Sequence, residues 1–116
     1  VGVIPYSPMG RGLLTGKISA THEYPPSDHR SKLPDFQPGR REAILAALAE
    51  IEPICLERGM TLGNLAVAWV LSQPGVTAAL VGARNARQAR ENAAALEVCL
   101  DEREEHAIRR VFEALD

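Results

Sequence analysis

The chain has 116 residues, 46% of them hydrophobic and 24% charged, which is enough for one small globular domain and excludes a disordered segment. The net charge of −2 argues against a general nucleic-acid binder, and no run approaches the roughly 20 apolar residues of a membrane span. No histidine or cysteine cluster has metal-ligand spacing, so no metal is expected. Cys55 and Cys99 lie among apolar residues and are predicted to be buried thiols in a reducing compartment.

The first predicted element is a short apolar strand over Val1–Tyr6, which ends before Pro8. A long segment rich in glycine and proline follows between Met9 and Arg40. Structureless loops of this length are uncommon unless they are functional or disordered. Because the chain begins within a predicted strand and lacks an initiator methionine, we expect it to be a piece of a longer protein.

Two helices are predicted next. The first runs from about Arg41 to Arg58, where Pro53 should bend or split it, and ends at Gly59. Its apolar face consists of Ile44, Leu45, Leu48, Ile51 and Cys55. The second is capped by Thr61 and stops at Gln73. Its predicted face consists of Leu62, Leu65, Ala66, Trp69 and Val70.

A second apolar strand is predicted at Thr77–Gly82, followed by two further helices. Asn85 and Gln88 form a capping-box pattern for a helix that runs to about Leu96. Asp101 with Glu104 opens the last helix, with an apolar face at Ala107, Ile108, Val111, Phe112 and Leu115. Strands that alternate with helices imply βα units and a parallel sheet. Two strands cannot complete such a sheet, so the pattern predicts part of an α/β domain.

The stretch "LVGARNARQARENAAA" predicts an anion site. Arginines near a helix start oppose the helix dipole, and a bound anion would offset that cost. Gly82 allows close approach of the backbone to a ligand, and Arg84 stands just before the free N–H groups of the helix. Gln88 and Asn92 lie one turn apart on one helix face and can bind a nucleobase or ribose. The alternative is a solvated basic helix, which we favour for Arg87 and Arg90.

The first strand leads into "YSPMGRGLLTGK", a second candidate for anion binding. Ser7 supplies a hydroxyl, the glycines free the backbone, and Arg11 and Lys17 add positive charge. The stretch comes close to a G-x-G-x-x-G fingerprint, but Thr15 occupies the third glycine position and no helix follows directly. A glycine-rich loop alone is a weak signal. Paired with the second strand end, it predicts that both strand ends meet one anionic ligand.

The segments "YSPMGRGLLTGK" and "LAVAWVLSQPGVTAALVGARNARQARENAAAL" resemble the carboxyl-terminal part of an aldo-keto reductase, with Met9 a mild departure. The resemblance covers nearly the whole chain. It implies an α/β fold in the form of a partial TIM (β/α)8 barrel, made of the last two βα units with extra helices. Residues 1–116 would then be the carboxyl-terminal fragment of a single barrel domain.

The resemblance also implies a cofactor, NADP(H), and a cytoplasmic parent enzyme that reduces aldehydes or ketones by reversible hydride transfer. Arg84 matches the arginine that holds the 2′-phosphate, and Gln88, Glu91 and Asn92 match positions at the adenosine end. The positions that match the pyrophosphate segment are Ser7, Pro8, Met9, Gly10, Arg11 and Lys17. The catalytic tyrosine, lysine, aspartate and histidine come from earlier strands and are absent here. Tyr6 is therefore interpreted as a packing or nicotinamide-stacking residue.

Two other interpretations stay open at this point. The chain could be a non-catalytic cofactor-binding or interaction module that needs a partner to complete the barrel. It could also be a plain α/β piece without a ligand, in which case Arg84→Ala would change stability by no more than about 0.5 kcal/mol.

Overall fold

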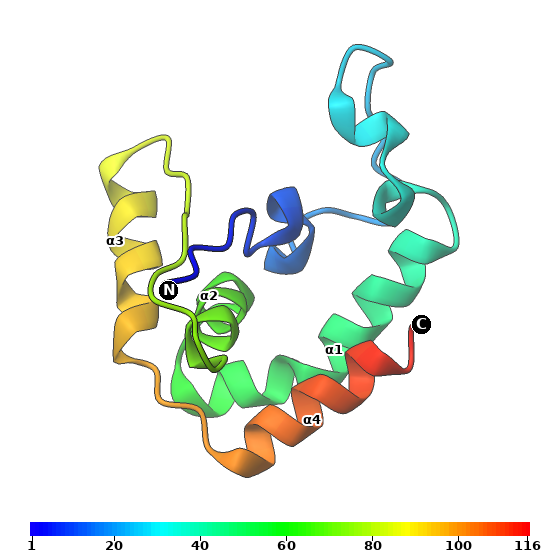
Figure 1. Ribbon diagram of the computed structural model, residues 1–116. Helices are drawn as coiled ribbons and strands as arrows, with labels where there is room; N and C mark the ends of the chain where they lie inside the picture. The colour runs from blue at the N-terminus through cyan, green and yellow to red at the C-terminus, as the bar shows by residue number, and fades with distance from the viewer.

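The computed structural model describes residues 1–116 as four α-helices and four short 3-10 turns, three of which precede the first α-helix (Figure 1). The α-helices are α1 (Arg40–Arg58), α2 (Leu62–Ser72), α3 (Ala86–Ala94) and α4 (Glu102–Glu113). The 3-10 turns are η1 (Gly10–Thr15), η2 (His29–Lys32), η3 (Pro34–Phe36) and η4 (Ala95–Glu97). In Figure 1, α4 runs alongside α1, and α2 lies between this pair and α3.

Both predicted strands are present only as extended segments that touch at two points. Isolated parallel bridges join Val3 to Val76 and Tyr6 to Leu80. The amide of Leu80 donates to the Pro5 carbonyl at 2.9 Å. The parallel pairing is as predicted, but full strands at Val1–Tyr6 and Thr77–Gly82 are not formed. Strands need further neighbours to complete their ladders, and nothing else in this chain pairs with these two segments.

Helix α1 forms the centre of the core. The sequence predicts a bend or a split at Pro53; the helix runs unbroken through this exposed residue, so the split is wrong. Gly59 ends the helix in the left-handed conformation, at φ 64°, as predicted. The buried residues that α1 shares with its neighbours are Leu13, Phe36, Ile44, Ala47, Leu48, Ile51, Cys55, Leu65, Ile108 and Val111.

Helix α4 is fixed to α1 at both ends. Near the start of α4, Arg58 Nε donates to Glu104 Oε2 at 2.6 Å, and the same guanidinium donates to the Cys99 carbonyl. The hydrogen bond from Arg58 holds the pKa of the Glu104 carboxyl at about 2. At the other end, Arg40 Nη1 donates to the Leu115 carbonyl at 2.7 Å. The predicted capping box of Asp101 and Glu104 opens α4.

Helix α2 is apolar around most of its circumference, and its buried face differs from the prediction. Thr61 caps it as predicted and forms a capping box with Asn64. Leu65 is buried as expected, but Val67 and Ala68 are buried at 3% exposure, whereas the predicted Ala66 and Trp69 are only half-buried. More than one face of α2 is buried because the helix is covered by neighbouring elements: it contacts η1 and α1 on one side and α3 and η4 on the other.

The predicted irregular loop between Met9 and Arg40 contains η1, η2 and η3 and has its own packing. Leu13 and Phe36 from this loop are buried in the core. Asp28 accepts two hydrogen bonds from the Arg30 side chain, at 3.1 and 2.7 Å, which hold the pKa of its carboxyl at about 2. The loop is therefore folded rather than structureless.

The two cysteines differ in exposure. Cys55 is buried, as predicted, and burial raises the pKa of its thiol to about 11. Cys99 is exposed, so the prediction of a buried thiol there is wrong: it lies in the short connection between η4 and α4.

No single helix has the length and apolar character needed to cross a membrane. Helices α1 and α2 taken together would be long and apolar enough, but they lie at 93° to each other.

Candidate cofactor site

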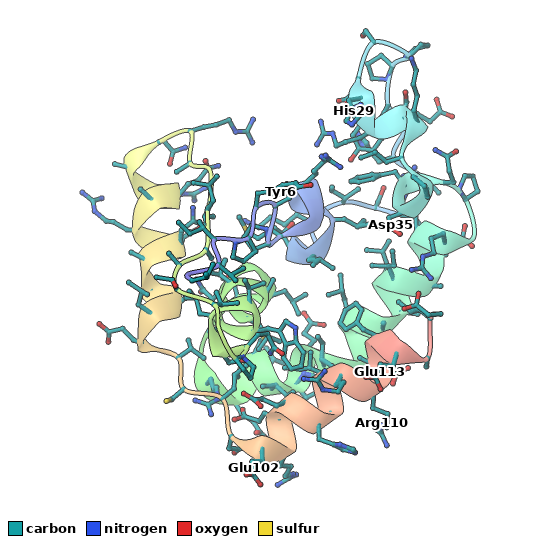
Figure 2. All side chains as sticks on the ribbon, in the orientation of Figure 1. Tyr6, His29, Asp35, Glu102, Arg110 and Glu113 are labelled. Atoms are coloured by element: carbon teal, nitrogen blue, oxygen red, sulfur yellow. The ribbon has the colours of Figure 1, made fainter.

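The candidate site begins where the two extended segments end together. Tyr6 and Leu80 pair in a parallel bridge, so Ser7 and Gly82 follow at the same edge. Figure 2 shows Tyr6 between α3 and the loop that carries His29, and its side chain is 76% exposed. The structure thus brings together the starts of the two sequence motifs, as the parallel arrangement predicts.

The loop after the first segment is held in an unusual backbone conformation. Ser7 and Arg11 have positive φ, at 53° and 56°, in the left-handed region that disfavours side chains by roughly 1–2 kcal/mol per residue. The amide of Gly10 donates to the Ser7 carbonyl at 3.0 Å, which closes the turn. Strained residues of this kind cluster at ligand sites. Sequence reasoning missed this feature because neither residue is a glycine.

The predicted residues of this loop differ in accessibility. Ser7, Arg11 and Lys17 are exposed, and no side-chain partner within the chain holds either cation. Pro8 is buried, so its side chain contributes to packing rather than to a ligand surface. Met9 lies against α2, where a Cβ on Gly63 would come within 3.3 Å of its sulfur. The absence of a side chain at Gly63 lets the loop approach α2 closely.

The turn before α3 is built by side-chain amides. Asn85 caps α3 by accepting from the Gln88 amide at 2.9 Å, as predicted. Gln88 Oε1, however, accepts from the Arg84 amide at 2.7 Å, so the predicted reciprocal half of the capping box is wrong. Asn92 Nδ2 donates to the Gly82 carbonyl at 3.0 Å. These bonds fold the Gly82–Asn85 turn onto the helix.

This arrangement leaves polar groups available at the turn. The Arg84 guanidinium is exposed and has no ion pair or hydrogen-bond partner in the chain. Arg87 and Arg90 are also exposed and unpaired, in keeping with a solvated face. One side of each of the Gln88 and Asn92 amides is used by the turn, while Gln88 Nε2 and Asn92 Oδ1 are free.

A small hollow of about 50 Å³ connects the two motifs. The predicted residues that line it are Met9, Lys17, Glu91 and Asn92. Asn64 of α2 lies between them and donates through Nδ2 to the Glu91 carbonyl. The hollow has room for a water or two rather than a nucleotide. It nevertheless shows that the loop and α3 face each other across the start of α2.

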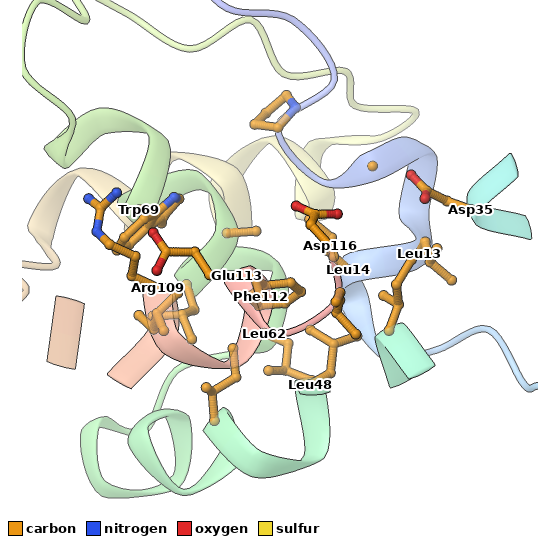
Figure 3. A pocket seen from close by; sticks show the side chains of 18 of the residues that line it. Leu13, Leu14, Asp35, Leu48, Leu62, Trp69, Arg109, Phe112, Glu113 and Asp116 are labelled. Atoms are coloured by element: carbon orange, nitrogen blue, oxygen red, sulfur yellow. The ribbon is translucent and has the colours of Figure 1, made fainter. Parts of the chain in front are cut away.

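A larger cavity of about 410 Å³ lies elsewhere, between η1, α1, α2 and α4 (Figure 3). Its wall is mostly apolar, with Leu14, Leu48, Leu62 and Phe112 among the lining residues. Pro8 and Gly10 are the only predicted site residues that reach it. No three His, Cys, Asp or Glu side chains gather anywhere in the structure to hold a metal ion. The polar residues that the sequence predicts to bind a ligand therefore lie outside this cavity, near the edge defined by Ser7 and Gly82.

The model of the aldo/keto reductase family matches residues 1–113, and the chain belongs to this family. A glycerol dehydrogenase AKR11B4 from Gluconobacter oxydans has a similar structure, with a TM-score of 0.90 and 35% identity, over 98% of this chain and 35% of that one. The fold is therefore that of this family.

Two curated relatives also match nearly the whole of this chain over about a third of their own length. The NADH-specific methylglyoxal reductase of Escherichia coli (strain K12) is 36% identical over 111 residues, 96% of this chain and 33% of that protein. The aldo-keto reductase yakc [NADP(+)] of Schizosaccharomyces pombe (strain 972 / ATCC 24843) is 30% identical over 116 residues, 100% of this chain and 33% of that protein. The chain spans about a third of the length of the curated relatives it matches. Their names differ in the cofactor.

Proposed function

We propose that this chain is the carboxyl-terminal part of an NADP(H)-dependent aldo-keto reductase and supplies much of its cofactor site. The two bridged segments would be the seventh and eighth strands of a TIM barrel, whose loops after these strands bind phosphate. The observation that carries the proposal is the exposed, unpaired Arg84 guanidinium at the strand edge shared with the loop from Ser7.

The residues present fit a phosphorylated dinucleotide. A planar guanidinium can hold a phosphate through two parallel hydrogen bonds, and the start of α3 adds the positive end of its dipole. The free Gln88 Nε2 and Asn92 Oδ1 offer a donor and an acceptor for the adenosine end. Arg11 and Lys17 supply positive charge beside the pyrophosphate. When bound, the nicotinamide supplies the hydride, and this chain orients the cofactor.

Choice between the two nicotinamide cofactors depends on Arg84. NADP(H) differs from NAD(H) by the 2′-phosphate, and one charge-assisted hydrogen-bonded pair contributes about 1.5–3 kcal/mol. The chemistry of the whole enzyme would be reduction of a small aldehyde or ketone in the cytoplasm. We propose that the isolated chain has no turnover, since the acid and base groups for that step lie outside it. Consumption of NADPH with methylglyoxal by this chain would contradict this.

NADPH and NADH titrations followed by cofactor fluorescence test the cofactor assignment. We expect Arg84→Ala to raise the Kd for NADPH about 10- to 100-fold and to leave the Kd for NADH nearly unchanged. Arg90→Ala is the matched control, because Arg90 is equally exposed and unpaired but lies further along α3. Equal losses in the two variants, or no NADPH binding by a wild-type chain that circular dichroism shows to be helical, would refute the assignment.

A further inference from the structure

Arg41 is a buried cation with no acidic partner. Only 7% of the residue is exposed, and every ion pair in the structure uses another arginine. Arg41 also lies in the first turn of α1, where a positive charge opposes the helix dipole. A buried charge is costly unless it is well hydrogen-bonded. The contacts of the Arg41 side chain must therefore compensate for the cost of burying its charge and for the unfavourable interaction with the helix dipole.

The Arg41 guanidinium is satisfied entirely by backbone carbonyls. Nε and Nη2 both donate to the Phe36 carbonyl, at 2.9 and 2.6 Å. Nη1 donates to the His22 carbonyl at 2.6 Å and, at 3.4 Å, to two carbonyls earlier in the loop. Those two belong to Ser19 and Ala20. One side chain therefore joins two segments of the loop, about fifteen residues apart, to the start of α1.

Tyr24 packs the same region from within the loop. Its ring lies 4.5 Å from the His22 ring and 5.5 Å from the Phe36 ring, both edge to face. The Arg30 guanidinium stacks over it at 4.5 Å, and that of Arg41 lies at 5.7 Å. Both contacts are in the range of cation–π attraction. The loop is thus folded around two cations and an aromatic cluster.

We propose that Arg41 is a positioning residue for the candidate cofactor site. By fixing the backbone from Ser19 to Phe36, it anchors the far end of the loop that carries Lys17, two residues before Ser19. This proposal rests on the proposed function for its ligand, but the hold on the loop is a property of the chain alone. The effect on binding would be indirect, because Arg41 is buried and touches no ligand.

The shape of the guanidinium explains why arginine stands here. Its fork reaches carbonyls on two sides at once, whereas a lysine ammonium is a compact point with a shorter reach. We therefore expect both Arg41→Met, which removes the charge, and Arg41→Lys, which keeps it, to release the loop. Arg58→Met is the matched control: it also loses several hydrogen bonds of an α1 arginine, but at the other end of the helix.

Limited proteolysis of the full chain measures the release. A glutamate-specific protease cleaves after the exposed Glu23, and mass spectrometry identifies that cut. Cleavage tracks the population of open loop when opening is fast. We expect cleavage at Glu23 to be at least tenfold faster in both Arg41 variants and to change less than twofold in Arg58→Met. If circular dichroism shows that Arg41→Met has lost helix, the Arg41→Lys variant decides the comparison. Equal cleavage rates in the Arg41 and Arg58 variants would overturn the proposal.

Cofactor titration then separates positioning from stability. Because the loop would serve the pyrophosphate, which both cofactors share, we expect Arg41→Lys to raise the Kd of NADPH and NADH by the same factor, about three- to tenfold. Arg84→Ala, in contrast, should raise the Kd for NADPH and leave the Kd for NADH nearly unchanged. A faster cut at Glu23 with unchanged affinity for both cofactors would overturn the positioning role. If the wild-type chain binds neither cofactor, the proposed function fails, and cleavage alone decides whether Arg41 holds the loop.

Discussion

The link between α2 and α3 through Asn64 allows a quantitative prediction. Asn64 is 8% exposed, and its Oδ1 accepts from the Thr61 hydroxyl at 3.0 Å while its Nδ2 donates to the Glu91 carbonyl. Asn85 is the natural comparison, because it also serves a helix start but is exposed and makes no contact between helices. Asn64→Ala and Asn85→Ala therefore differ mainly in the bond between helices.

The expected costs follow from these contacts. Asn85→Ala removes a single cap, which is typically worth about 1 kcal/mol. Asn64→Ala removes half of a capping box and also leaves the part-buried Glu91 carbonyl without its partner. Loss of that partner costs about 1–3 kcal/mol for a fully buried group, so we expect the lower part of this range here. We expect the free energy of unfolding to fall by about 2–3 kcal/mol for Asn64→Ala, at least about 1 kcal/mol more than for Asn85→Ala.

Urea denaturation followed by far-ultraviolet circular dichroism measures both variants. With an m-value of about 1–2 kcal/mol/M for a chain of this size, a difference of about 1 kcal/mol separates the two midpoints by roughly 0.5–1 M urea. The m-values themselves should stay equal to that of the wild type. Midpoints that coincide would refute the reasoning, because they would show that the bond from Asn64 to Glu91 adds nothing to the cap.

Three further outcomes are expected. Leu65→Ala should lower the free energy of unfolding by about 3 kcal/mol in the same assay, since Leu65 is 2% exposed. The Glu104 pKa lies below its unfolded value, so its contribution to stability is present at neutral pH and is lost as pH falls from about 5 through about 2. Thermal melts should show a smaller loss in Arg58→Met over that range. A thiol reagent should label the exposed Cys99 in the native chain, and Cys55 only after unfolding.

Local chemistry made the helix ends predictable. Thr61, Asn85 and Asp101 each cap a helix through a side chain three residues from its partner, and such contacts need no knowledge of the rest of the fold. Gly59 ends α1 for an equally local reason. The same holds for the apolar face of α1, whose buried residues follow the helical spacing.

Features that depend on neighbours far along the chain were not predictable. Val67 and Ala68 are buried because α2 is covered on two sides, and periodicity alone indicates one face. Gln88 accepts from Arg84 rather than completing the capping box, since the turn before α3 bends back over the helix. The hold of Arg41 on the loop is invisible in sequence because its partners are backbone carbonyls, which carry no residue signature.

Of the candidate site, sequence reasoning foresaw the parallel pairing of the two segments and named Arg84, which the structure leaves exposed. It also named Lys17 and Asn92, which the structure brings to one small hollow. Their role in binding NADP(H) stays a prediction. The strained backbone at Ser7 carried no signal in the sequence, since serine is not a residue that usually marks positive φ.

The pairing of α1 with α4 has a consequence for how the chain is made. The contact from Arg40 to Leu115 joins residues that are 75 positions apart, and α4 is the last helix of the sequence. During synthesis the apolar face of α1 emerges long before the helix that covers it. Exposed apolar surface of this kind makes nascent chains prone to aggregation. A ribosome-bound chain that stops before α4 should therefore present Ile44, Leu48 and Ile51 to chaperones until translation resumes.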